Sequence, residues 1–66
     1  MSLVVNDILE KITDSFFGGE KFKIVSLKNI NGQVHASIVN INDDNSEITI
    51  ALSVLEDQKR FKVVSS

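Results

Sequence analysis

The side chains that could do chemistry in this chain are mostly carboxylates, because it contains one histidine, His35, and no cysteine. Catalytic triads, Cys–His pairs and the usual zinc sites all depend on histidine or cysteine side chains. Asp43 and Asp44 would suit acid–base catalysis, but the sequence shows no orienting group or anion stabiliser near them. We therefore expect a non-enzymatic protein with no cofactor and no metal site.

The loop "NDDNSE" is similar to the start of a calcium-binding loop, because Asn42, Asp44 and Ser46 stand at alternate positions. The similarity ends at Glu47, where such a loop needs glycine, and at Ser53, where it needs a bidentate acid. We interpret this loop as a solvated turn. The chain also lacks the glycine-rich motifs that bind phosphate groups.

Basic side chains fall in two groups along the chain and form a candidate interaction patch of Lys21, Lys23, Lys28, Lys59, Arg60 and Lys62. The net charge is −3 over residues 1–20, +3 over 21–42, −5 over 43–57 and +3 over 58–66. If the strands that carry the two basic groups lie side by side, the groups merge into one patch. Alternating charge also keeps a domain soluble and keeps edge strands from pairing wrongly.

An amphipathic helix is the first element expected, from about residue 6 to residue 17. Apolar residues recur there at three- and four-residue spacing, at Ile8, Leu9, Ile12, Phe16 and Phe17. Asn6 has the side chain of an N-cap, and Gly18 or Gly19 is suited to ending a helix. We expect this helix to pack on a sheet through its apolar stripe.

From Lys21 onward the apolar residues alternate with polar ones, which predicts strands at about 21–30, 33–41, 47–55 and 60–64. The Asn31–Gly32 pair between the first two strands is typical of a structural type I′ turn. A turn of this kind fixes the register of the hairpin, and the pairs it predicts are Ile30 with Gln33, Leu27 with Ala36, Val25 with Ile38 and Phe22 with Ile41.

These elements predict the α+β class, with an N-terminal amphipathic helix followed by a strongly twisted antiparallel meander of three to four strands. Both faces of the predicted hairpin are apolar near its open end. A helix laid on the second face would explain this pattern, and so would closure of the sheet into a small SH3-like or Sm-like barrel.

The stretch "NINGQVHASIVNIND", with the elements on either side of it, resembles the opening of a small Sm-like RNA-binding barrel over about half of the chain. The resemblance implies a topology and no functional residues. The sequence departs from that family at "LEDQKRFKVVSS", which has no histidine beside a lysine, and at Ala36, where the family favours glycine.

The length of 66 residues predicts one small domain over residues 1–66. A domain of this size hides only about 60% of the surface of its unfolded chain, and without disulfides such domains often associate. This favours a homo-oligomer or a bound partner. The first residues lack the pattern of a signal peptide and no apolar run approaches a membrane span, so we expect a cytoplasmic location without membrane contact.

Two functions are compatible with these features. The first is a small acidic protein-interaction module (a subunit, adaptor or inhibitor, of a size and acidity also found among phage-encoded inhibitors) that docks through a sheet edge or the helix. The second is a small β-barrel that binds RNA or DNA through the basic patch, with Phe22 and Phe61 as stacking residues. The net charge of −2 favours the first, and so does the alternation of both phenylalanines with lysines, which would turn the rings inward.

Overall fold

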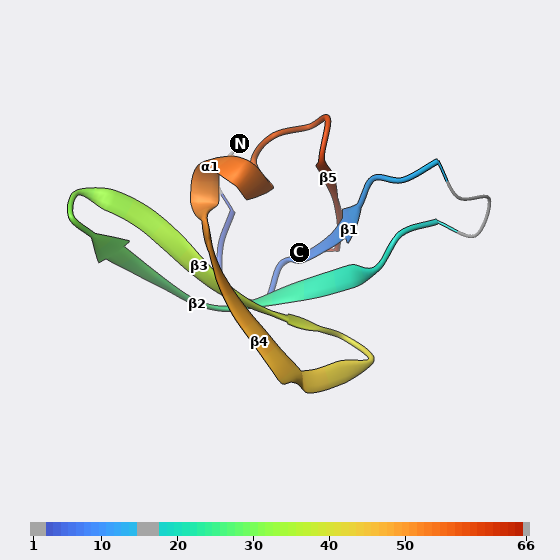
Figure 1. The fold of residues 1–66 in the computed structure, drawn as a ribbon, viewed down its shortest axis with the longest axis horizontal. Coiled ribbons are helices and arrows are strands. Elements are labelled where there is room, and N and C mark those ends of the chain that lie inside the picture. The colour runs from blue at the N-terminus through green and yellow to red at the C-terminus, as the bar shows by residue number, and fades with distance from the viewer. Residues whose placement is uncertain (1–2, 15–17, 66) are drawn as a thin grey trace.

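The computed structural model describes residues 3–14 and 18–65, which form a five-stranded antiparallel sheet with one single-turn helix. The elements follow the chain in the order β1 (Ile8–Lys11), β2 (Lys21–Ile30), β3 (Gln33–Asn40), β4 (Asp43–Ala51), α1 (Leu52–Leu55) and β5 (Phe61–Ser65). Across the sheet the order is β4-β3-β2-β1-β5, so β4 and β5 are its two edges (Figure 1).

The predicted N-terminal helix at residues 6–17 is wrong, and with it the α+β class. Residues Ile8–Lys11 form β1, which lies between β2 and β5 and pairs antiparallel with both. Asn6 has a φ of 81° and belongs to a turn before β1, so it does not cap a helix. The only helix in the described residues is α1.

Two physical effects explain why β1 is a strand. Ile8, Ile12 and Thr13 are branched at Cβ, which lowers their helix propensity and suits them to a pleated surface. A strand at this place also pairs with the backbone groups of β2 and β5, which a helix would leave unpaired because its own hydrogen bonds are internal. Of the predicted apolar stripe, Leu9 is buried and Ile12 is 42% exposed; Phe16 and Phe17 lie outside the described residues.

The β2–β3 hairpin turns at Asn31 and Gly32, whose φ values are 54° and 85°. Positive φ at both central residues defines the type I′ turn, whose twist matches that of the flanking strands. The Asn29 Oδ1 atom accepts a hydrogen bond from the Gly32 N–H at 2.8 Å. Beside the turn, Ile30 pairs with Gln33 and Leu27 pairs with Ala36, which is the register that the sequence predicts.

Farther from the turn the register shifts by one residue at Val25. Ile24, not Val25, pairs with Ile38, and Phe22 pairs with Asn40, so the predicted pairs at this end are wrong. The extra residue turns the Val25 side chain to solvent and leaves that of Ile24 fully buried. Such a bulge also bends the strand, and the start of β2 pairs with β1 on its other side.

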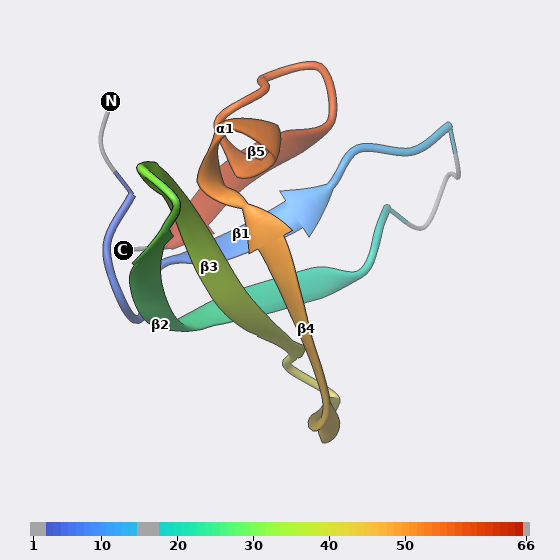
Figure 2. The same cartoon turned by 60° about the vertical axis from the view of Figure 1, so that its left-hand side comes forward.

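The third predicted strand, 47–55, needs a correction at both ends. β4 begins at Asp43 and ends at Ala51, and the chain then turns into α1, which packs against β3 and β4. Figure 2 shows α1 at the end of β4, with β5 beyond it beside β1. Ile48 is branched and apolar like a core residue, but it lies on an edge strand and is 51% exposed.

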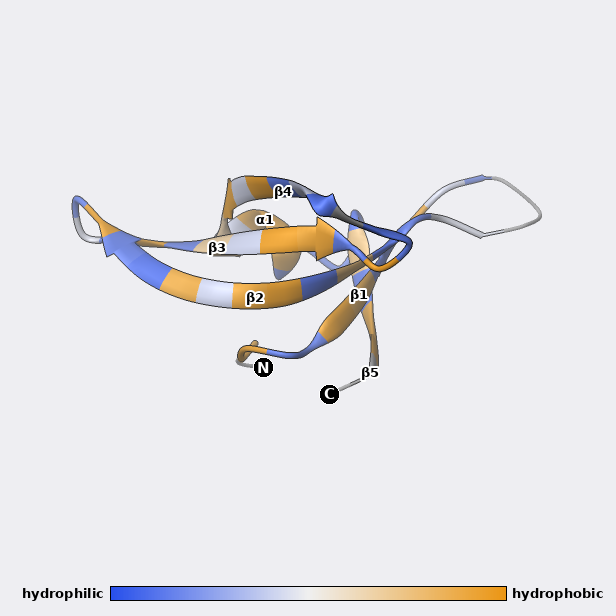
Figure 3. Cartoon of the chain, turned by 90° about the horizontal axis from the view of Figure 1, so that it is seen from below, coloured by the Kyte–Doolittle hydropathy of each residue, from blue (hydrophilic) through white to orange (hydrophobic). Residues whose placement is uncertain are grey.

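The hydrophobic core takes buried residues from the N-terminal segment, from α1 and from every strand except β4: Leu3, Leu9, Ile24, Ala36, Ile38, Leu55 and Phe61. β4 contributes the partly buried Ile50. Figure 3 shows the hydrophilic start of β4 on one side of the molecule and the hydrophobic start of β1 on the other. β4 and β5 do not pair with each other, so the sheet stays open and both edges are unpaired in the single chain.

Candidate functional site

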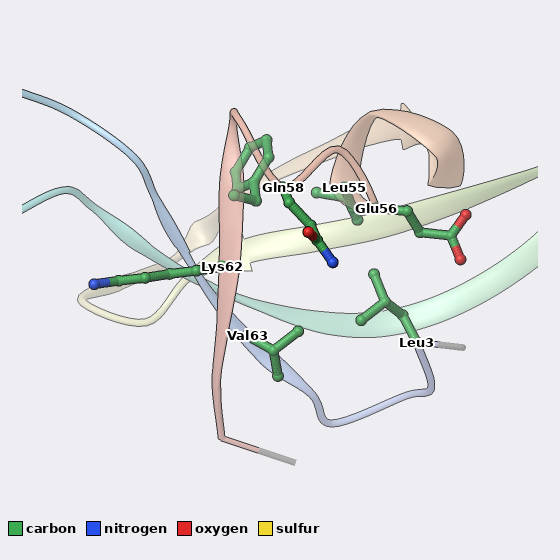
Figure 4. A pocket seen from close by; sticks show the side chains of 7 residues that line it. Leu3, Leu55, Glu56, Gln58, Lys62 and Val63 are labelled. Atoms are coloured by element: carbon green, nitrogen blue, oxygen red, sulfur yellow. The ribbon is translucent and has the colours of Figure 1, made fainter. Parts of the chain in front are cut away.

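A pocket of about 550 Å³ lies beside β5, between that strand, the N-terminal segment and the end of α1 (Figure 4). Its apolar lining consists of Leu3, Leu55, Phe61 and Val63, and its polar lining of Glu56, Gln58 and Lys62. Leu3 and Val63 face each other across it, and the Gln58 side chain projects between them. The Lys62 side chain points away from the pocket, as expected for the residue between Phe61 and Val63 on a strand.

A tight turn before β1 places Leu3 at the pocket. The Asp7 N–H donates to the Val4 carbonyl at 3.1 Å, and the Val4 N–H donates to the Asp7 Oδ2 atom at 3.0 Å. Asn6 supplies the positive φ that the turn requires, and its N–H donates to the Ile24 carbonyl at 2.8 Å. This anchoring holds Leu3 against the core, where it is 6% exposed.

The segment after α1 forms the upper wall of the pocket and leads the chain into β5. Leu55 is the buried residue of α1, and its side chain is 2% exposed. The Asp57 carbonyl then accepts hydrogen bonds from the N–H groups of Arg60 and Phe61, at 2.9 and 3.0 Å. This closed turn brings Phe61 back to the core opposite Leu55, so the pocket walls are fixed by backbone hydrogen bonds.

The outer edge of β5 carries peptide groups that no neighbouring strand uses. The Ile12 N–H donates to the Arg60 carbonyl at 2.8 Å, and Lys62 pairs with Glu10 two residues further along the ladder. Hydrogen-bonded pairs alternate with non-bonded pairs along antiparallel strands, so the N–H and C=O of Val63 point away from β1. No backbone hydrogen bond outside the strand ladders involves Val63 within residues 3–14 and 18–65.

Two of the six predicted basic residues come together, through a residue that the sequence did not single out. Lys21 and Lys62 lie on either side of Glu10, with Nζ-to-carboxylate distances of 4.0 and 3.9 Å. β1 separates the strands that carry them, so the condition for one merged basic patch, that the 21–30 and 60–64 strands lie side by side, is not met. The arrangement is a row of Lys, Glu and Lys across three strands.

The other four basic residues form no ion pair with Glu10, although Lys23 and Arg60 each stand two positions from a lysine of this row. Lys23 pairs with Ile8 and Val39 in the sheet, and Lys28 pairs with His35 near the hairpin turn. Lys59 and Arg60 belong to the loop before β5, where the Arg60 Nε atom lies 3.4 Å from the Asp57 carboxylate. The six residues are therefore spread over the molecule and interrupted by acids.

The two phenylalanines that were candidates for base stacking contact each other. The ring centroids of Phe22 and Phe61 are 6.4 Å apart, and the rings meet edge to face at 73°. Phe61 is 9% exposed and belongs to the core cluster, against which Phe22 packs. Neither ring presents an open face of the kind that a nucleobase needs.

Of the residues considered for catalysis or calcium binding, His35, Asp43 and Ser46 have structural contacts, and the Asp44 side chain lies outside what the structure describes. The His35 Nδ1 atom lies 3.0 Å from the Gln33 carbonyl. The Asp43 carboxylate accepts hydrogen bonds from the Asn45 N–H at 3.2 Å and from the Ser46 hydroxyl at 2.8 Å, which holds the irregular start of β4. No group of three or more potential metal ligands occurs among the described residues.

Sequence reasoning missed Leu3, Glu10 and Leu55. Leu55 was assigned to a strand, whereas Glu10 fell within the predicted helix. The signal that could have corrected the helix is Asn6–Asp7, a pair typical of a turn, directly before a short apolar segment. The pairing of Glu10 with two lysines depends on strand order and leaves no signal in the sequence.

Comparison with models of known protein families, with characterised proteins and with solved structures gives no match. In the part of the chain that the structure describes, no helix has the length and apolar character needed to cross a membrane.

Proposed function

We propose that this chain is a small acidic, non-enzymatic protein-interaction module that binds an extended segment of a partner protein along the outer edge of β5. The observation that carries the proposal is the position of the pocket directly beside an unpaired strand edge. Strand addition needs both features, since backbone hydrogen bonds supply affinity and side-chain pockets supply specificity.

The backbone of β5 supports this mode of binding. The outward N–H and C=O of Val63 would each gain a partner from an added strand. Alternate side chains of that strand would lie on the same side of the sheet as Phe61 and Val63 and would reach the pocket.

The pocket supports the proposal through its lining. Its apolar side chains come from three separate parts of the chain, and Gln58 projects into it as a hydrogen-bonding group. Small pockets with an apolar wall and a few polar groups are typical ligand sites. An apolar side chain of the partner would cover Val63, which is 38% exposed beside the buried Leu3 and Leu55.

A selection from random linear peptides, with the folded protein as bait, tests the proposal. Val63→Asp places a charge on the pocket wall and should abolish binding of the selected peptides. Ile48→Asp is the matched control, because Ile48 is an exposed branched residue on the other edge strand; it should bind like the unchanged protein. Amide spectra of both variants would verify that the fold is intact.

Two results would overturn the proposal. Selected peptides that bind Val63→Asp as tightly as the unchanged protein would place the site elsewhere. Submicromolar, salt-sensitive binding of a single-stranded oligonucleotide, without any selected peptide, would assign the chain to nucleic-acid binding instead.

A further inference from the structure

The two faces of β5 differ in chemistry. Phe61 and Val63 line the pocket, whereas Lys62 points away from it. The hydrogen bond from the Ile12 N–H to the Arg60 carbonyl extends the β1–β5 ladder by one residue before β5 begins. Alternation along the strand then places Arg60 on the same face as Lys62. Phe61 and Val63 therefore lie on one face and the two cations on the other, and the exposed Val64 stands at the register shift between β1 and β5.

The cations on this face are accessible and only partly compensated. Glu10 is a single carboxylate between two ammonium groups, those of Lys21 and Lys62, so this row keeps a net positive charge. The side chains of Arg60 and Lys62 are 66% and 60% exposed, although Asp57 lies beside the first. Each can accept a further carboxylate from solvent.

We propose that the segment bound along β5 alternates apolar and acidic side chains. This rests on the function proposed above and names the chemistry of the partner. An added strand would place its apolar side chains at the pocket and its carboxylates opposite Arg60 and Lys62. Opposite charges on directly facing strand positions are stabilising, and like charges there are destabilising.

Three synthetic seven-residue peptides measure this preference. Each carries valine at three alternate positions between serine ends, and the two positions between the valines are both glutamate, both serine or both lysine. The glutamate peptide should bind about tenfold more tightly than the lysine peptide, with the serine peptide between them. Its advantage should shrink as salt is added, because both cations are exposed.

Charge reversal in the protein tests whether Arg60 and Lys62 cause the preference for the glutamate peptide. The double variant Arg60→Glu with Lys62→Glu should invert the order, so that the lysine peptide binds best. Lys28→Glu is the matched control, because Lys28 is an exposed lysine near the hairpin turn, away from β5; it should keep the original order.

The outcomes separate this inference from the proposed function. Equal binding of all three peptides, lost in Val63→Asp, would overturn the acidic preference and leave strand addition at β5 in place. No binding by these peptides or by any selected peptide would overturn both. A chain that forms a stable oligomer by sedimentation, with β5 amides already protected from exchange and not displaced by the glutamate peptide, would show that a second copy occupies the edge.

Discussion

The two edges of the sheet, β4 and β5, meet solvent in different ways. β4 begins in an acidic turn, where Asp43 is hydrogen-bonded to its own loop, and it carries Glu47. β5 contains Phe61, Val63 and Val64 and has a pocket at its side. Charged side chains on an edge strand discourage the addition of another chain. The difference teaches that the pocket, and not length or exposure, sets β5 apart, since β4 is the longer and more exposed of the two.

Ile48 is an exception on β4, because it is an apolar residue that is 51% exposed and so favours pairing with an added strand there. Neither the pocket beside β5 nor a second one at the β1–β2 connection is lined by a β4 residue. An added strand at β4 could therefore gain backbone hydrogen bonds without reaching either pocket. This is why the comparison of Val63→Asp with Ile48→Asp is informative.

The largest effect is expected from Ile24→Ala, which tests whether the two edges belong to one cooperative unit. Ile24 is fully buried in β2, the strand that pairs with both β1 and β3. Truncation of a buried isoleucine costs about 2–5 kcal/mol, enough to unfold a domain of this size. Urea denaturation followed by circular dichroism measures it, with Ile48→Ala as an exposed control. A loss below about 1 kcal/mol would mean that the two halves of the sheet are stable separately.

A smaller effect, confined to the β5 side, is expected from Gly19→Ala. An added Cβ at Gly19 would stand 1.7 Å from the Lys11 carbonyl oxygen, so the β1–β2 connection must shift. Overpacking of this kind costs about 1–3 kcal/mol. Amide exchange should accelerate first in β1 and β5 and last in β4.

Gly32→Ala is the matched control for that variant. An added Cβ at Gly32 meets nothing within 4 Å, and only its φ of 85° is unfavourable. The expected cost is about 1 kcal/mol, from the backbone conformation alone. Equal costs for Gly19→Ala and Gly32→Ala would contradict the crowding at Gly19.

The smallest effect is expected from Glu10→Gln, which keeps the shape of the side chain and removes its charge. Its two ion pairs are long, and the lysine side chains are 46% and 60% exposed, so the expected loss of stability is below about 1 kcal/mol. Thermal melting at low and high salt measures it, and the loss should vanish at high salt. A salt-independent loss of several kcal/mol would show that Glu10 acts through packing.

Local chemistry determined the β2–β3 hairpin. Asn31 and Gly32 are the residues that adopt positive φ at least cost, and a two-residue turn fixes the pairs next to it. The strand range 21–30 follows from the alternation that starts at Lys21 and coincides with β2. The bulge at Val25 could not be predicted in the same way, because Ile24 and Val25 are both branched and apolar and either could enter the core. Only the pairing of β2 with β1, on the side away from β3, decides which of them is buried.

The candidate site was less accessible to prediction than the hairpin. The sequence identified the basic residues, but it could not show that Glu10 stands between Lys21 and Lys62, since β1 was assigned to a helix. Leu3 and Leu55 are 52 positions apart and meet only when α1 and the N-terminal turn close over the core. No local pattern specifies a contact at that separation.

The sequence by itself determined the elements whose reasons are local: the type I′ turn, the strands on either side of it, and the alternation of charge along the chain. Tertiary structure decided the state of residues 8–11, because their short apolar pattern fits one face of a helix as well as a strand. It also decided which strands become edges and which side chains surround the pocket. These outcomes depend on hydrogen bonds and apolar contacts between segments far apart in the chain. The free energy of these interactions exceeds the small differences in local secondary-structure propensity.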